Sequence, residues 1–209
     1  MSSRRLTLVT DGPFDRVLLR HVSWLMRRLL RETIVVQPQW AGFRGLRIAP
    51  KGLAEKIGRA IELFPCDLLI VHRDSESPSP DARFEEVRQA LSEASCKVAA
   101  IGVVPVRMTE AWLLFDQHAI RVAAGNPNGN TPLPIPTTHW DDLPDPKKVL
   151  WEALRVASGL PGRRLKKFPV CAAAHRVSEC IDDFSALFSL RAFARFGTDL
   201  ETILRELKW

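Results

Sequence analysis

The chain contains no tyrosine, so any reaction whose nucleophile is a tyrosine hydroxyl of this polypeptide is excluded. Cysteine is sparse and scattered. Cys66, Cys96, Cys171 and Cys180 form no C-x-x-C pair, and they do not alternate with histidines at the spacing of zinc ligands. We therefore expect reduced thiols and no zinc site.

Long hydrophobic runs are also lacking. No apolar stretch approaches the roughly 18 residues of a membrane span, and the first residues contain no signal-peptide hydrophobic segment. These absences favour a cytoplasmic protein with no membrane partner. Positive charge is plentiful instead, with a formal net charge of +6, and this favours contact with a polyanion such as nucleic acid.

Short β-rich runs alternate with helical patterns through the first half of the chain. Strands are predicted over residues 5–10, 33–40, 66–71 and 97–106, and helices over residues 14–31, 50–64 and 81–94. This alternation predicts an α/β fold with a mostly parallel four-stranded sheet that helices cover on both faces.

Beyond the fourth predicted strand the sequence changes character. Residues 109–124 have a helical pattern, residues 125–146 form a loop rich in proline, asparagine and glycine, and the remainder is helical. We therefore expect an α/β core over residues 1–108 and a helical extension over residues 109–209 packed on it. The two parts could also form one continuous domain.

Acidic side chains follow the first and third predicted strands. Asp11 and Asp15 come after the first, and Asp74 and Glu76 come after the third. Functional groups of an open parallel sheet gather beyond the carboxyl ends of its strands, and clustered carboxylates are stabilised by a hard cation. Asp11, Asp74 and Glu76 are thus candidate ligands for Mg²⁺ or Mn²⁺, although each of them singly also fits a helix cap or a turn.

Further candidates lie beside these carboxylates. Glu110 follows the fourth predicted strand and is either a third acidic site residue or a first-turn glutamate favoured by the helix dipole. Arg73 and Arg107 could hold a phosphate, or they could neutralise the carboxylates through salt bridges. His72 could carry a proton, although a lone histidine at a strand end is more often structural.

Basic residues are densest in residues 162–168. The run contains Arg163, Arg164, Lys166 and Lys167. It could clamp a phosphate backbone, or it could be ordinary solvated surface.

The acidic pattern resembles that of the Toprim superfamily, the metal-binding domain shared by topoisomerases, bacterial primases and OLD-type nucleases. LVTDGPFD (residues 8–15) resembles the family's acidic residue and glycine after the first strand, and LLIVHRDSES (residues 68–77) resembles its later Asp-x-Asp element. The chain also resembles a group of small Toprim-like proteins associated with ATPase-containing anti-phage systems, through VPVRMTEAWLLFD (residues 104–116) and DPKKVL (residues 145–150).

The resemblance implies a Toprim-like, Rossmann-like fold and magnesium-dependent hydrolysis of nucleic-acid phosphodiester bonds, in DNA or RNA. It implies Asp11, Asp74 and Glu76 as catalytic residues, to which the position of Glu110 after the fourth predicted strand adds a further candidate, and an ATPase protein as a partner in anti-phage defence. Without a tyrosine, the topoisomerase reaction is excluded for this chain.

Two departures from the family pattern leave other functions open. Asp11 stands where the family usually has glutamate, and Glu76 stands where it has the second aspartate. A catalytically degenerate module that binds nucleic acid or a partner ATPase is therefore the main alternative. Nucleotidyl transfer of the primase kind would need the same metal and also a nucleotide pocket, which the sequence does not reveal.

Overall fold

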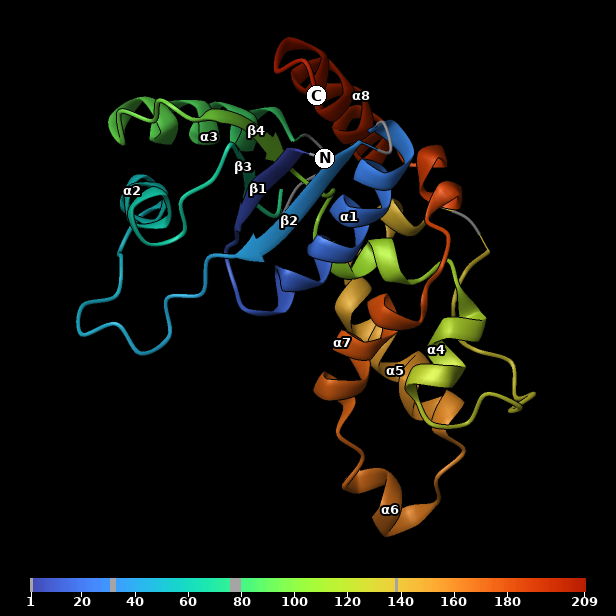
Figure 1. Cartoon of the computed structure of the whole chain (residues 1–209). Helices are drawn as coiled ribbons and strands as arrows, with labels where there is room; N and C mark the ends of the chain where they lie inside the picture. The colour runs from blue at the N-terminus through green and yellow to red at the C-terminus, as the bar shows by residue number, and fades with distance from the viewer. Residues whose placement is uncertain (1, 31–32, 76–79, 138) are drawn as a thin grey trace.

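A computed structural model describes residues 2–30, 33–75, 80–137 and 139–209. These residues form a four-stranded, all-parallel sheet in the order β2-β1-β3-β4, with helices on both faces (Figure 1). The strands are β1 (Ser2–Val9), β2 (Ile34–Trp40), β3 (Leu68–His72) and β4 (Ala99–Val103). The predicted α/β fold, with its parallel sheet and helical carboxyl-terminal part, is confirmed.

The helices fall into two groups along the chain. Between the strands lie η1 (Phe14–Val17), α1 (Leu18–Leu29), α2 (Leu53–Leu63) and α3 (Asp81–Glu93). After β4 come η2 (Thr109–Leu113), α4 (Gln117–Ala123), η3 (Trp140–Asp142), α5 (Pro146–Ser158), α6 (Gly162–Lys166), α7 (Val170–Cys180), η4 (Ser185–Ser189) and α8 (Arg191–Glu206). Among the described residues, no helix combines the length and apolar character needed to cross a membrane.

The strand sequences account for their places in the sheet. Every residue of β3 is buried, which is typical of a central parallel strand covered on both faces. Among the described residues β2 pairs with β1 alone and forms an edge of the sheet. Pro38 is tolerated there because proline has no N–H to donate and the outward side of an edge strand needs no donor.

Alternate residues of β3 enter two hydrophobic cores. Leu69 and Val71 pack with residues of α2 and α3, whereas Ile70 packs with residues of α1 and the carboxyl-terminal helices. This second core crosses residue 108, because it joins strand residues to Trp112 and Phe193. The division into residues 1–108 and 109–209 therefore stays a prediction.

The predicted helix over residues 109–124 is two elements. η2 ends at Leu113, and α4 begins after Asp116, whose carboxylate accepts a hydrogen bond from the backbone N–H of Ala119 at 2.9 Å. This N-cap starts a new helix with its own axis. Because η2 is a separate element, its first turn, which contains Glu110, lies close to the end of β4.

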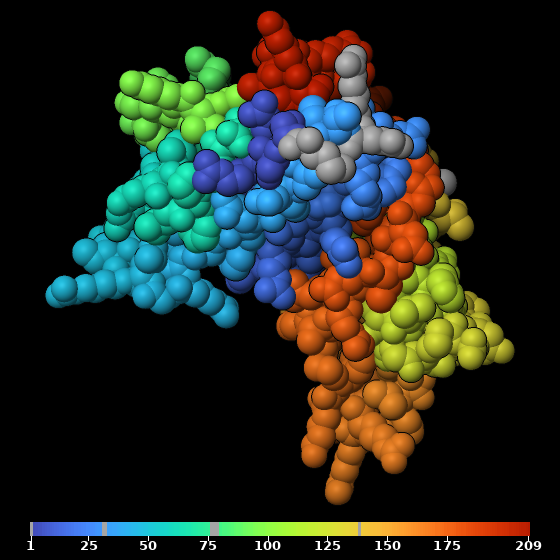
Figure 2. All heavy atoms as spheres, in the orientation of Figure 1, coloured from blue at the N-terminus to red at the C-terminus, as the bar shows by residue number. Residues whose placement is uncertain are grey.

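The helix α6 and the adjoining ends of α5 and α7 form an arm that projects from the body of the molecule, with α6 at its far end (Figure 1). The loop between β2 and α2 projects from the body as well. Figure 2 shows the outline of the molecule indented between this loop and the arm. The β2 arrow in Figure 1 points toward the same side, so the carboxyl ends of the parallel strands face that side.

The first turn of α5 is capped. The Asp145 carboxylate accepts a hydrogen bond from the backbone N–H of Lys148 at 2.9 Å, and Pro146 occupies the first helical position. We expect Asp145→Ala to lower the free energy of unfolding by about 1 kcal/mol in urea denaturation, because one helix N–H loses its acceptor. Asp145→Asn keeps a capping oxygen and should lose little. Equal losses in both variants would contradict the capping role.

Candidate acidic site at the carboxyl ends of the strands

Three strand ends bring acidic side chains to one edge of the sheet. η1, which follows β1, carries Asp15; the segment after β3 carries Asp74; and η2, which follows β4, carries Glu110. β2 and β3 lie on opposite sides of β1, so the chain reverses its winding direction between β1 and β3. Ligands of parallel α/β sheets bind in the crevice at such a point.

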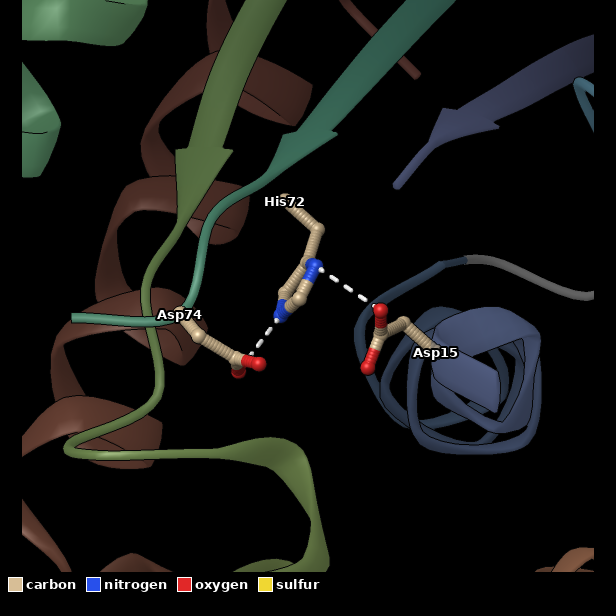
Figure 3. A group of neighbouring side chains, drawn as sticks. All are labelled: Asp15, His72 and Asp74. Carbon is tan, nitrogen blue, oxygen red and sulfur yellow. Dashed lines mark hydrogen bonds and ion pairs between the residues drawn. The ribbon is translucent and has the colours of Figure 1, made fainter. Parts of the chain in front are cut away.

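The centre of the site is a buried histidine between two carboxylates, Asp15 and Asp74 (Figure 3). His72 Nδ1 lies 3.7 Å from Asp15 Oδ2, and His72 Nε2 lies 3.2 Å from Asp74 Oδ1. One ligand atom of each residue lies within 4.8 Å of the others, a grouping that could hold a metal ion.

Asp15 is held in place by the loop after β1. The backbone N–H of Gly12 donates to Asp15 Oδ2 at 3.0 Å, and the Thr10 hydroxyl donates to the Gly12 carbonyl at 2.7 Å. Asp15 is only 5% exposed. Burial raises the pKa of its carboxyl; the charge of His72 opposes this effect, and the negative charge of Asp74 adds to it.

Asp74 bridges the end of β3 and the start of η2. Its Oδ1 accepts a hydrogen bond from the backbone N–H of Thr109 at 3.1 Å, and the Thr109 hydroxyl lies 3.1 Å from His72 Nε2. The Asp74 side chain is 25% exposed, whereas that of His72 is fully buried. Asp74 therefore joins the buried histidine to the surface of the site.

Opposing effects act on His72. Burial disfavours the protonated ring, but the hydrogen bond with Asp74 and the charges of Asp15, Asp74 and Asp11 outweigh it, so the pKa of His72 is raised. Its Nδ1 is buried and has no hydrogen-bond partner within the described part of the chain. That nitrogen faces the Asp15 carboxylate.

Glu110 adds a further acidic group to the site. The residue is 5% exposed, and burial raises the pKa of its carboxyl to about 7, with the negative charges of Asp74 and Asp15 acting in the same direction. The charge of Lys147, in the first turn of α5, lowers this pKa in part. Two buried carboxyl groups, Asp15 and Glu110, therefore lie close enough to the partly exposed Asp74 to feel its charge.

This donor set fits a divalent cation. Carboxylate oxygens are the preferred protein ligands of Mg²⁺ and Mn²⁺, and crowded carboxylates are stabilised by a nearby positive charge. The carboxylates of Asp15 and Asp74 would hold the ion, and Glu110 lies close enough to feel their charges. The unpartnered nitrogen of His72 offers either a further ligand atom or a counter-charge beside them.

Asp11 has different interaction partners from Asp15. The Asp11 carboxylate forms an ion pair with Arg73 and accepts a hydrogen bond from the backbone N–H of Asp74 at 3.3 Å. Arg73 also pairs with Glu86 on α3 at 2.8 Å. Asp11 thus joins the segments after β1 and β3, and the assignment of Asp11 and Arg73 to metal and phosphate stays a prediction. Glu76 lies outside the described residues.

Arg107 has an unusual backbone conformation beside the site. Its φ is +60°, in the left-handed region, and its backbone N–H donates to the Ser75 hydroxyl at 2.9 Å. A non-glycine residue in this region costs roughly 1–2 kcal/mol, and such strain concentrates at functional sites. Its Nε is buried without a hydrogen-bond partner among the described residues.

The predicted basic run lies on α6 and its C-cap, at the far end of the arm (Figure 1). The side chains of Arg163, Arg164, Lys166 and Lys167 are all exposed. They are therefore accessible to a large polyanion, and they are not part of the acidic site itself.

Two residues of the site, Asp15 and His72, were not among the metal ligands predicted from the sequence. Asp15 stands next to the Gly12–Pro13 turn, and a turn of this kind brings a side chain three residues along back toward its own backbone. His72 and Asp74 are two residues apart at a strand end, the spacing that places both on one side. These local signals could have identified both residues.

Comparisons of the chain with models of protein families, with curated proteins and with solved structures found no match. The strand order and the helical layers fit a Rossmann-like or Toprim-like layout. The Toprim relationship drawn from the sequence stays a prediction.

Proposed function

We propose that the protein is a divalent-cation-dependent nuclease that hydrolyses phosphodiester bonds of DNA or RNA. The observation that carries this proposal is the grouping of Asp15, His72 and Asp74 at the strand ends, with Glu110 close enough to feel the charges of both carboxylates. The net charge of +6 supports a polyanionic substrate. Mg²⁺ or Mn²⁺ is the proposed cofactor.

When bound, such an ion supplies Lewis-acid stabilisation of the charge that develops on the phosphoryl oxygens, and it activates water. The chain's own residues would bind the ion and orient the groups around it. Asp15 and Asp74 would hold the ion, and His72 would orient the two carboxylates, since it lies between them, 3.7 Å from Asp15 and 3.2 Å from Asp74. Arg107, held beside the site by its bond to Ser75, can pair with a phosphate oxygen.

Metal removal tests this function. Purified protein should bind Mn²⁺ or Mg²⁺ saturably in calorimetry, and it should cleave labelled single-stranded or duplex DNA or RNA in the presence of the metal. EDTA should abolish cleavage, and excess metal should restore it. A folded protein that binds neither metal would sink the proposal.

The basic end of the arm provides a separate prediction. We expect Arg164→Glu to weaken nucleic-acid binding and to reduce the slope of log affinity against log salt by roughly 0.9 for each phosphate group that the variant no longer neutralises. Fluorescence anisotropy at several salt concentrations measures both. Arg205→Glu, the same charge change at an exposed site on α8, is the control. Equal effects of the two changes would show that net charge, and not the arm, determines binding.

One observation favours a second candidate function, a degenerate module that binds nucleic acid or a partner ATPase. The Asp11 carboxylate, which occupies the family's first acidic position by resemblance, is already paired with Arg73. Such a module would bind nucleic acid equally well with and without EDTA. It would also be indifferent to the loss of the Asp74 charge.

A further inference from the structure

A hollow of about 380 Å³ adjoins the acidic site. The loop of residues 10–13 lines one side, residues 40–46 line much of the other, and Lys56 lies between them. The volume falls near the lower end of the roughly 300–1,000 Å³ typical of small-molecule sites. Gly12 lines this hollow and also donates to Asp15, so the hollow and the acidic site share a wall.

Two aromatic rings face this hollow. The Trp40 indole donates to the Thr10 hydroxyl at 2.9 Å, which fixes the orientation of the ring. Gly42 lies so close to that ring that a Cβ at position 42 would fall 2.7 Å from Cζ3 of Trp40. Phe43 packs edge-on against Phe64, with ring centroids 6.3 Å apart, and both Trp40 and Phe43 remain partly exposed.

Two positive charges accompany the rings. Lys56 Nζ donates to the backbone carbonyls of Asp11 at 3.1 Å and Thr10 at 3.4 Å, which are neutral acceptors, and it has no ion-pair partner within the described part of the chain. Arg44 is exposed and forms no ion pair with any residue that the structure describes. Aromatic rings beside such cations match a nucleotide, because the base stacks on a ring and the phosphate pairs with a cation.

We propose that this hollow binds one unpaired nucleotide of a single-stranded nucleic acid, next to the phosphodiester bond that the acidic site cleaves. The assignment rests on the proposed nuclease function and names the strand form of its substrate. A base inside a duplex is paired on its edge and stacked on both faces, so it cannot enter a lined hollow without leaving the helix. The preferred substrate is therefore a single strand or an opened end.

Binding measured without metal tests this assignment separately from cleavage. In EDTA, fluorescence anisotropy should show tighter binding of a single strand of about 12 nucleotides than of the same sequence as a duplex. Phe43→Leu, which keeps apolar bulk but removes the stacking surface, should weaken single-strand binding about tenfold and leave duplex binding unchanged. Phe43→Trp should retain the affinity.

A second variant guards against a folding defect in Phe43→Leu, which circular dichroism would reveal. Arg44→Ala should also weaken single-strand binding, whereas Arg47→Ala, which removes an exposed cation of the same loop that does not line the hollow, should have less effect.

Equal affinity for single strands and duplexes would overturn the assignment, as would full single-strand affinity in folded Phe43→Leu and Arg44→Ala. Metal-dependent cleavage in that case would preserve the nuclease function without this subsite. Conversely, Phe43-dependent binding with no metal-dependent cleavage would remove the nuclease function and retain the nucleotide site.

Discussion

Asp74→Asn is expected to reduce metal-dependent cleavage by at least about a hundredfold, since even residues that only support metal ligands typically contribute 10–100-fold. The substitution removes the carboxylate charge and keeps an oxygen that can accept from the backbone N–H of Thr109. Because the Asp74 side chain is 25% exposed, the variant should remain folded. Calorimetry should show a parallel loss of Mn²⁺ or Mg²⁺ binding.

Glu86→Gln is the matched control. Glu86 pairs with Arg73 close to the site, but it is not part of the group formed by Asp15, His72 and Asp74. Initial rates at saturating metal should therefore stay within a small factor of those of the unmodified protein. If Asp74→Asn cleaves and binds metal normally, the acidic site is not the catalytic centre.

Acidification is expected to destabilise the protein through His21. Its ring is fully buried against Phe184, with ring centroids 4.3 Å apart, and it also contacts Trp112. Burial lowers the pKa of His21 to about 4 from 6.5. Below pH 6.5 the unfolded chain takes up a proton on His21 that the folded chain excludes. The contribution of His21 to the free energy of unfolding is therefore fully present above pH 6.5 and is lost as the pH falls toward 4.

The shift of the His21 pKa from 6.5 to about 4 corresponds to about 3 kcal/mol of unfolding free energy. His21→Gln has no proton to take up. Urea denaturation across this pH range should therefore show the unmodified protein losing about 3 kcal/mol more than the variant. The comparison cancels contributions from the other titrating groups. Identical pH profiles would show that His21 is charged or solvated in the folded protein.

Much of the fold follows from local patterns. β3 was predicted from its compact β-rich run, and α3 from its helical spacing, because each signal lies within a few residues. The order β2-β1-β3-β4 depends on which side of β1 each later strand joins. No local pattern encodes that choice, since packing of distant helices against the two faces decides it.

The site was predicted less completely for a similar reason. Asp74 and Glu110 were selected because strand ends mark the functional edge, and the structure places both there. The Asp11 carboxylate pairs with Arg73, and Arg73 also pairs with Glu86 on α3. That helix is distant in sequence, so local spacing could not show the pairing.

The sequence alone also could not show that Trp40 and Phe43 line the hollow. The chain has 6 tryptophans and 10 phenylalanines, and most aromatic residues of a globular protein serve its core. Only the fold shows that Trp40 and Phe43 reach the loop after β1.

The Thr10 hydroxyl connects the hollow to the acidic site through hydrogen bonds. It accepts from the Trp40 indole and donates to the Gly12 carbonyl, while the Gly12 N–H donates to Asp15. Three hydrogen bonds thus run from an aromatic ring to a buried acid. If the hollow and the acidic site bind the ligands proposed for them, immobilising one end of this chain of hydrogen bonds would reduce the entropy that the other end must lose on binding. Thermodynamic reciprocity would make that effect equal in both directions.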